Sequence, residues 1–213
     1  MIEFPRVWSA TDLGELRPAG AFTTYAGWPY ETLPSLRPER RDGFAWAGDA
    51  ATSAPDAERL AELETLARSL PPGIALPESF VRYMSRPALT ALLDEVSTTA
   101  CRTDLSDVIA SPVEEGAHLV RFFRDQQDCV FWYLYLRPNG ESFVVDSEWS
   151  ERFADAEGRP EFFWSAPTIE EFTYRYWLEC KCWYVLSDYF EGEETPEVVA
   201  YLSHYGEKVP TGE

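Results

Sequence analysis

The sequence predicts one soluble domain in which antiparallel strands are preceded and followed by helices. Between Asp56 and Leu70, leucines recur every three or four residues with charges between them, which indicates an amphipathic helix. β-Branched and aromatic residues are then frequent through residues 118–145, as is typical of strands. A Thr-x-x-Glu pattern at Thr168 marks the start of a long helix. With 213 residues, 45% of them hydrophobic, the chain can bury one proper core.

Residues 1–56 predict an irregular N-terminal arm in front of the main domain, residues 57–213. The arm is rich in proline, glycine and tryptophan and shows little sustained periodicity. Its aromatic residues are too many for a solvated linker, so we expect the arm to bury them against the main domain. These aromatic residues are Trp8, Phe22, Trp28, Phe44 and Trp46. A detachable tail that binds a partner is the alternative interpretation.

The first part of the main domain is expected to be helical. The helix that begins near Asp56 should stop at Pro71, because a second proline and a glycine follow. A short helix is expected after Pro77, since proline suits the first turn of a helix. Pro87 should end it, and residues 88–96 are expected to add a further turn or two.

Two or three antiparallel strands are expected in residues 118–145, with a strong turn signal, PNG, at residues 138–140. The middle strand, DCVFWYLYL, is apolar in both of its side-chain registers. One register holds Cys129, Phe131, Tyr133 and Tyr135, and the other holds Val130, Trp132, Leu134 and Leu136. A strand that is apolar on both faces is usually central, so we expect the helix at Thr168 to cover one face and another element the other.

The best-marked helix begins at Thr168, where the Thr168 hydroxyl and the Glu171 carboxylate are expected to satisfy amides of the first turn. We expect this helix to run to Phe190 with an apolar stripe wide enough to imply burial on more than one side. After the acidic stretch EGEE, Thr195 and the proline behind it predict another short helix, which Gly206 closes.

The charge balance excludes some classes of partner. The chain carries 18 basic and 37 acidic residues, a formal net charge of −19, which repels nucleic-acid phosphates and anionic membrane surfaces. We therefore expect no direct binding to nucleic acid or membranes. A solvated acidic surface is the simpler interpretation, and a surface complementary to a basic partner is the more specific one. No secretory signal, membrane span or disulfide-scaffold pattern is recognisable, so a cytoplasmic location is expected.

The sequence motifs of common catalytic sites are absent. The chain has no G-x-S-x-G elbow, phosphate-binding loop, G-x-G-x-x-G or H-E-x-x-H pattern. Its two histidines, His118 and His204, are expected to be ordinary surface or boundary residues. Cys180 and Cys182 project about 200° apart on a helix, so we expect them to pack as small hydrophobic side chains and not to share an ion. We therefore predict no catalytic residue, no metal and no cofactor.

Asp125 and Asp128 precede the middle strand, where short acidic residues commonly form turns. A functional role for them beside a cleft of aromatic side chains would make the protein a small-molecule sensor or enzyme. A deep pocket that contains an acid with a raised pKa would favour this alternative.

Several stretches resemble the SUKH superfamily, which includes the yeast cell-wall-synthesis regulator of the Smi/Knr type and many bacterial proteins. They are IALPESFVRYM, the DQQDCVFWYLYL strand with its PNGESFVV turn, and APTIEEFTYRYWLECKCWY. The likeness is strongest to actinobacterial Smi/Knr-like proteins, which have a leucine-proline helix start and a closing "sIeeFl" helix, and it covers about residues 60–190. The matching residues are Leu76, Pro77 and Phe80 at the front and Thr168, Ile169, Glu171 and Phe172 at the back.

The resemblance implies an α+β domain whose mainly antiparallel sheet is flanked by helices. It also implies a partner, because bacterial members often look like immunity proteins that bind and block a toxin, frequently a basic nuclease, encoded beside them. The net charge of −19 fits such a partner, since an acidic face attracts a cationic protein. Our leading hypothesis is therefore a non-enzymatic, cytoplasmic immunity-type protein that neutralises a cognate toxin by binding it.

The densest acidic run supplies the first candidate contacts for such a toxin, and the acids before the middle strand supply the others. These candidate residues are Asp188, Glu191, Glu193, Glu194, Asp125 and Asp128. A regulatory or scaffold module that docks through the aromatic arm is a further alternative. An exposed row of Trp8, Trp28 and Trp46 would support that alternative.

Overall fold

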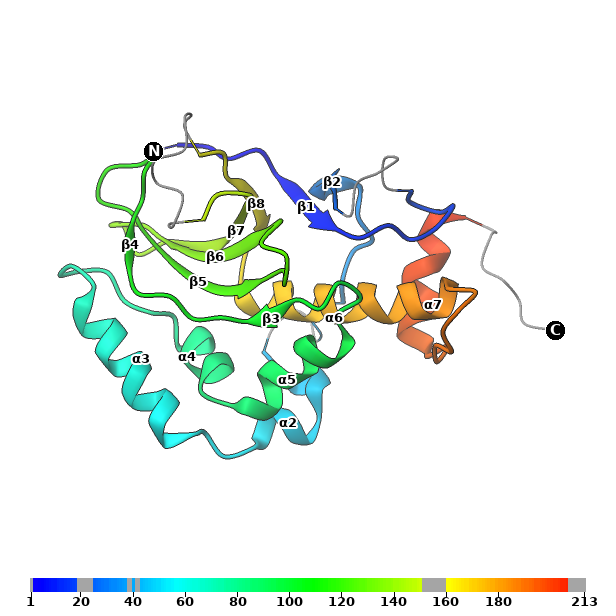
Figure 1. Cartoon of the computed structure of the whole chain (residues 1–213), viewed down its shortest axis with the longest axis horizontal. Helices are drawn as coiled ribbons and strands as arrows, with labels where there is room; N and C mark the ends of the chain where they lie inside the picture. Colours follow the sequence, from blue (N-terminus) through cyan, green and yellow to red (C-terminus); the bar gives the residue numbers. More distant parts are fainter. Residues whose placement is uncertain (1, 19–24, 38–39, 41–42, 151–159, 207–213) are drawn as a thin grey trace.

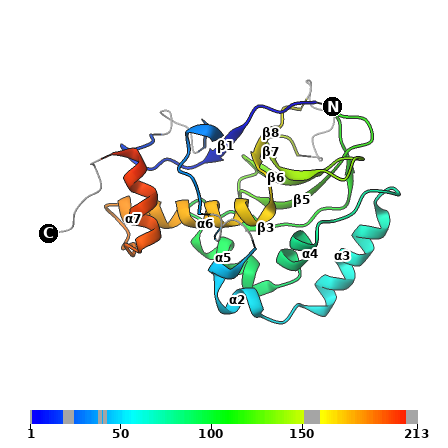
Figure 2. The ribbon, with the colours of Figure 1, turned by 180° about the vertical axis from the view of Figure 1, so that it is seen from behind.

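The computed structural model describes residues 2–18, 25–37, 40, 43–150 and 160–206. These residues form a six-stranded antiparallel sheet, a small N-terminal hairpin and a layer of helices (Figure 1). The α+β class with a mainly antiparallel sheet is therefore confirmed. Figure 2, from behind, shows the same helices lying along one side of the sheet.

Neighbouring strands follow the order β3-β5-β6-β7-β8, and β4 also pairs with β5. All of these pairings are antiparallel. The strands are β3 (Arg102–Thr103), β4 (Ile109–Ala110), β5 (His118–Arg124), β6 (Phe131–Leu136), β7 (Ser142–Ser147) and β8 (Phe163–Ala166). The PNG turn between β6 and β7 contains Gly140 at a φ of +84°, a left-handed conformation that favours glycine. The short strands β3, β4 and β8 were not predicted.

The central strand is β6, and all of its residues are buried. Trp132 lies in the same apolar cluster as Phe172, on the face that the helices cover. Tyr133 lies in a separate apolar cluster on the other face of the sheet. This cluster also contains Phe162, and Phe4 of the arm packs against it. The prediction of a two-faced central strand is confirmed, and the arm and loops cover the face that the helices leave open.

Two of the helices begin at residues that favour a helix start. They are α2 (Asp49–Thr52), α3 (Ala57–Ser69), α4 (Glu78–Met84), α5 (Pro87–Val96), α6 (Ile169–Leu186) and α7 (Pro196–Leu202), with 3-10 turns η1 (Tyr30–Thr32), η2 (Ala45–Ala47) and η4 (Ser203–Tyr205). The Asp56 side chain accepts from the Arg59 amide at 2.8 Å and starts α3 as expected. Pro87 is the first residue of α5, where a proline costs no helical hydrogen bond.

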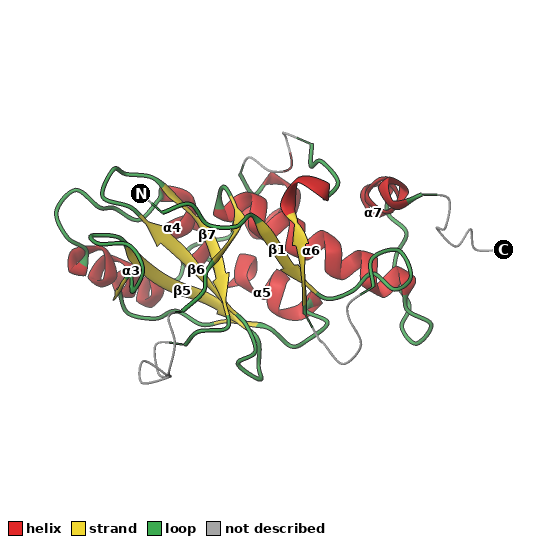
Figure 3. Cartoon of the chain, turned by 90° about the horizontal axis from the view of Figure 1, so that it is seen from above, coloured by secondary structure: helices red, strands yellow, loops and turns green. Residues whose placement is uncertain are grey.

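The long helix α6 contributes side chains to two apolar clusters, the main core beneath the sheet and a smaller cluster with α7. The Thr168 hydroxyl accepts from the Glu171 amide at 3.1 Å, which confirms the predicted helix start and one half of the predicted capping pair. The Glu171 carboxylate accepts from the Tyr30 hydroxyl of the arm and not from an amide of the first turn. Seen from above, α6 runs from the sheet toward α7 (Figure 3). Its first turns pack in the main core, whereas Leu178 and Cys182 pack against α7. The helix ends at Leu186, one turn before the expected end at Phe190.

The N-terminal arm is more regular than the sequence predicted. Its strands β1 (Val7–Ala10) and β2 (Ala26–Pro29) form an antiparallel hairpin. The Trp164 amide of β8 donates to the Pro5 carbonyl at 2.8 Å, so the arm runs alongside the last strand of the sheet. The prediction of an irregular arm missed this hairpin because its strands are only four residues long and are paired across a long connection.

The aromatic side chains of the arm lie in or against the core. Trp8 and Phe44 are buried in the main apolar cluster, and Trp28 and Trp46 are half-buried against it. Phe22 lies outside the described residues. Among the described helices, none combines the length and the apolar character that a membrane crossing needs.

Candidate functional site

Four of the predicted contact residues lie on one connection between α6 and α7. This acidic aromatic loop, residues 187–195, lies beyond the end of α6 and away from the sheet (Figure 1). Asp188, Glu191, Glu193 and Glu194 are all exposed on it. The structure therefore keeps these four acids together, as the sequence order requires, on a connection that water reaches.

Two aromatic residues in this loop are exposed, which the sequence analysis missed. The side chain of Tyr189 is 91% exposed and that of Phe190 is 57% exposed. Among the described residues, the only other large hydrophobic side chain with comparable exposure is Val199, on the neighbouring helix α7. Single exposed apolar residues are ordinary, but adjacent aromatic residues surrounded by charge are typical of protein contact surfaces.

The loop is held against the last turn of α6. The Phe190 ring lies 5.6 Å from the Trp183 ring and 5.9 Å from the Tyr184 ring, measured between centroids. A Cβ atom added to Gly192 would lie only 2.3 Å from the Val185 amide nitrogen, so only glycine permits this close approach. The loop backbone is thus fixed in a shape that leaves Tyr189 pointing into solvent, which lowers the entropy cost of binding a partner.

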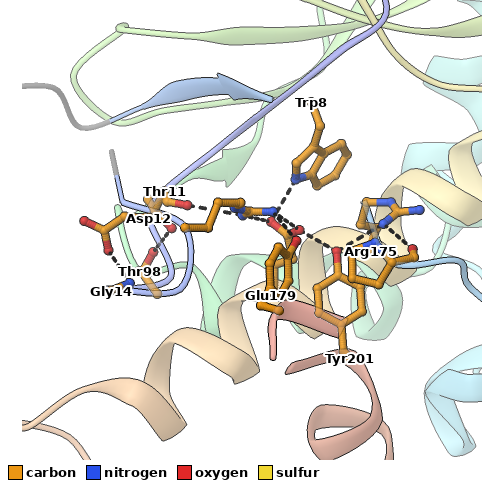
Figure 4. Close-up of polar contacts among 11 residues, drawn as sticks. Trp8, Thr11, Asp12, Gly14, Thr98, Arg175, Glu179 and Tyr201 are labelled. Carbon is orange, nitrogen blue, oxygen red and sulfur yellow. Dashed lines mark hydrogen bonds and ion pairs between the residues drawn. The ribbon is translucent and has the colours of Figure 1, made fainter. Parts of the chain in front are cut away.

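The second anchor of the loop is α7, which begins where the loop ends. The Thr195 hydroxyl accepts from the Val198 amide at 3.4 Å and starts this helix. The Tyr201 hydroxyl donates to Glu179 of α6 at 2.5 Å in a buried contact (Figure 4). Both ends of the loop are therefore attached to α6.

Glu179 is the centre of a buried polar network that joins the arm to α6 and α7 (Figure 4). Its carboxylate accepts from Arg17 at 2.6 and 2.7 Å, a fork-to-fork pair, and from the Trp8 indole nitrogen at 2.8 Å. Burial alone would raise the pKa of Glu179, but the Arg17 charge and these hydrogen bonds outweigh burial and hold the pKa below its ordinary value. Burial together with the nearby Glu179 charge raises the pKa of Tyr201 well above its ordinary value.

Arg175 extends the network toward the arm. Its guanidinium donates to the Pro34 carbonyl and to the Tyr201 hydroxyl, each at 3.0 Å, and lies 3.6 Å from the Glu171 carboxylate. Tyr30 of the arm donates to the same Glu171 carboxylate. These charged groups are buried and paired with one another, and only the Nε atoms of Arg17 and Arg175 lack a hydrogen-bond partner within the network. The network therefore holds the arm and α7 in position on α6.

Asp125 and Asp128 lie in the connection between β5 and β6. Asp125 is 2% exposed, and its carboxylate accepts from the Tyr25 hydroxyl at 2.8 Å and from the Gln127 amide at 2.7 Å. Asp128 is exposed, has a φ of +60° and pairs with Arg124. Asp125 is therefore oriented inward as a turn former, and only Asp128 presents its carboxylate to solvent. Neither belongs to the acidic aromatic loop.

The residues with metal or redox potential are packed as ordinary side chains. Cys180 and Cys182 are buried in different apolar clusters, and burial raises the pKa of Cys180 to about 12. His204 contacts the Thr32 carbonyl at 3.1 Å, and His118 contacts the Gly116 carbonyl at 3.2 Å. Within the described ranges, no three histidine, cysteine, aspartate or glutamate side chains are grouped so that they could hold a metal ion.

No family model, curated protein or solved structure gives a significant match. The motif resemblance to the SUKH superfamily therefore stays a prediction.

The sequence did contain a signal for the exposed aromatic residues. Tyr189 and Phe190 follow a serine and an aspartate, which commonly end helices, and precede a glycine between acids. Their spacing also continues the apolar stripe of α6, so the pattern alone predicts that they belong to this helix. Only the extended conformation of Ser187, with φ −80° and ψ 131°, turns them away from it.

Proposed function

We propose that this protein is a non-enzymatic, cytoplasmic immunity-type protein that binds and neutralises a cognate toxin, with a basic nuclease as the first candidate. The observation that carries the proposal is the acidic aromatic loop, in which Tyr189 and Phe190 are exposed among four carboxylates. Tyrosine and tryptophan are enriched among the few residues that dominate binding energy at protein interfaces, while acids around them select a basic partner and speed its approach.

The rest of the molecule supports binding as the role of this loop. The loop is fixed by Gly192 and by the attachment of α7 to Glu179, so it needs little reordering on contact. The net charge of −19 adds a long-range attraction for a cationic protein. The SUKH-like motifs point to the same class of partner.

The two alternatives have less support. A scaffold module that docks through the arm needs an exposed tryptophan row, but Trp8 is fully buried and Trp28 and Trp46 are half-buried. A small-molecule site at Asp125 needs an open carboxylate, but Asp125 is buried and already accepts three hydrogen bonds.

The direct test is binding to the product of the neighbouring gene, measured by calorimetry, together with rescue of growth when both are expressed. Replacing Tyr189 and Phe190 with alanine should weaken binding by roughly a hundredfold, as expected when two interface anchors are lost. The single variant Tyr189→Ala should weaken binding with little change in the thermal unfolding temperature, because this side chain is 91% exposed. Phe190→Ala also removes ring contacts with Trp183 and Tyr184, so its unfolding temperature is measured alongside its binding.

Variants that remove acidic charges distinguish long-range electrostatic attraction from direct contact at the interface. The double variant D188N/E191Q should slow association and reduce its salt dependence, whereas D49N/E115Q removes two exposed acids elsewhere and serves as the matched control. If no adjacent gene product binds, or if the alanine variants bind like the parent protein, the proposal is wrong.

A further inference from the structure

A groove of about 880 Å³ lies between α3 and residues 104–109. It lies on the helical side, where α3 is the outermost helix (Figure 2). Its lining mixes acids with apolar side chains such as Leu66 and Leu105. The groove is far from the acidic aromatic loop along the chain and uses none of its residues.

One wall of the groove is a single face of α3. The wall residues recur every three or four positions, as residues on one helix face do. They are Glu58, Ala61, Glu62, Thr65, Leu66 and Ser69. At 1.5 Å per residue this face is about 16 Å long. Residues 104–109, if extended at 3.3 Å per residue, span about the same length. The two walls therefore match along the groove.

The other wall is an edge of the sheet. The amides of Asp104 and Ser106 donate to carbonyls of β5, each at 3.0 Å. The amides of Leu105 and Asp107 alternate with these two and have no hydrogen-bond acceptor among the described residues, so we expect them to point away from β5. The Thr103 amide, which also points outward, is already bound to the Asp94 carboxylate at 2.8 Å. Leu105 and Asp107, whose amides are open, both line the groove.

The charge of the groove selects its occupant. Glu58 and Asp107 are exposed, and neither forms an ion pair with any described residue. Glu62 forms only an exposed pair with Arg59, which water screens. Asp104 is already neutralised, because Arg124 lies 2.5 Å from its carboxylate and Arg121, which also lines the groove, lies 3.3 Å from it. The acids left without an ion pair to a described residue are therefore Glu58 on α3 and Asp107 on the facing segment, one on each wall of the groove.

We propose that the groove binds an extended, lysine- or arginine-bearing segment of a partner protein, which adds to the sheet edge as a further strand. The amides of Leu105 and Asp107 donate to the segment, and Glu58 and Asp107 receive its basic side chains. The groove length fits about five extended residues. This binding surface shares no residue with the acidic aromatic loop, so either proposal can be disproved while the other stands.

The test uses the whole protein and the probe peptide acetyl-Lys-Val-Lys-Val-Lys-amide, with binding followed by NMR titration and calorimetry. Binding should perturb the Leu105 and Asp107 amide signals. The Leu105→Pro variant removes one outward amide, and Leu105→Ala is its matched control, which keeps the amide and loses the same side chain. The proline variant should bind roughly tenfold more weakly than the alanine variant, as expected for one lost backbone hydrogen bond.

A second arm does not depend on the folding of a variant. A strand added to an edge uses amides of one parity only, so methylating the valine amides or the lysine amides of the peptide should abolish binding in one case and spare it in the other. The E58Q/D107N variant should bind the peptide more weakly, and its affinity should depend less on salt concentration. If the peptide does not bind, if both methylated peptides bind alike, or if Leu105→Pro equals Leu105→Ala, the proposal is overturned.

Discussion

Replacing Asp146 with asparagine is expected to change the stability of the protein little near pH 4 and to stabilise it increasingly from there up to about pH 7. Asp146 lies on β7 and is 2% exposed. Its carboxylate accepts from the Ser9 hydroxyl of the arm at 2.7 Å and from the Ser165 hydroxyl of β8 at 2.6 Å. Burial raises its pKa from 3.8 to about 7, and these two hydroxyls only partly oppose the effect of burial.

The sign of the effect follows from proton binding. Between pH 4 and 7 the folded protein holds a proton on Asp146 that the unfolded chain has released, so folding is favoured at low pH and loses this contribution as pH rises to 7. At 1.36 kcal/mol per pKa unit, the difference between 3.8 and about 7 corresponds to about 4 kcal/mol of stability lost. Asparagine resembles the protonated carboxyl in shape and does not ionise, so the variant avoids this loss.

The assay is urea unfolding of the parent and D146N proteins at several pH values from 4.5 to 8.5. The difference in free energy of unfolding between the two proteins is the informative quantity, because contributions from the other acids cancel in it. It should shift in favour of D146N as pH rises and then level off above pH 7. The Ser9→Ala control removes one donor and should extend the shift to higher pH. A difference that stays constant with pH would refute the reasoning.

Three further predictions concern the network, the loop and the thiols. Glu179→Ala should destabilise folding by about 3–5 kcal/mol because it leaves the buried Arg17 charge unpaired, and adding Arg17→Met should recover part of that loss in urea unfolding. Gly192→Ala should displace the acidic aromatic loop at a cost of about 1–3 kcal/mol, visible as shifted NMR signals of Tyr189 that a Gly206→Ala control does not show. In native protein, iodoacetamide should modify Cys129 alone among the four cysteines, as read by peptide mass spectrometry, and all four should react in urea. Equal labelling of all four cysteines in native protein would contradict the burial of the other three.

The elements with strong local signals could be predicted from the sequence. The Asp56 and Thr168 helix starts depend on a side chain and an amide three residues apart, and both are found where expected. The two apolar registers of β6 fixed its central place, because only a strand covered on both faces can bury both. The hairpin of the arm escaped prediction, since strands of four residues carry little periodicity.

The candidate site was predictable in part. Its acids were found because they are adjacent in sequence, but its exposed aromatic residues were not, because Tyr189 and Phe190 also fit the stripe of α6. Asp125 was predicted as a turn residue with a possible contact role, and its burial depends on the Tyr25 hydroxyl, which comes from the distant arm. The spacing of residues along the sequence does not show which residue of a turn will be buried by a segment that is distant in the chain.

The sequence by itself determined where helices and the main strands form, and it set the acidic charge, because these depend on neighbouring residues or on composition. Tertiary structure decided which polar groups are buried and which apolar groups are exposed. Arg17 meets Glu179, and Ser9 meets Asp146, only after segments more than a hundred residues apart have packed together. The free energy of such contacts depends on burial, and burial exists only once the core has formed.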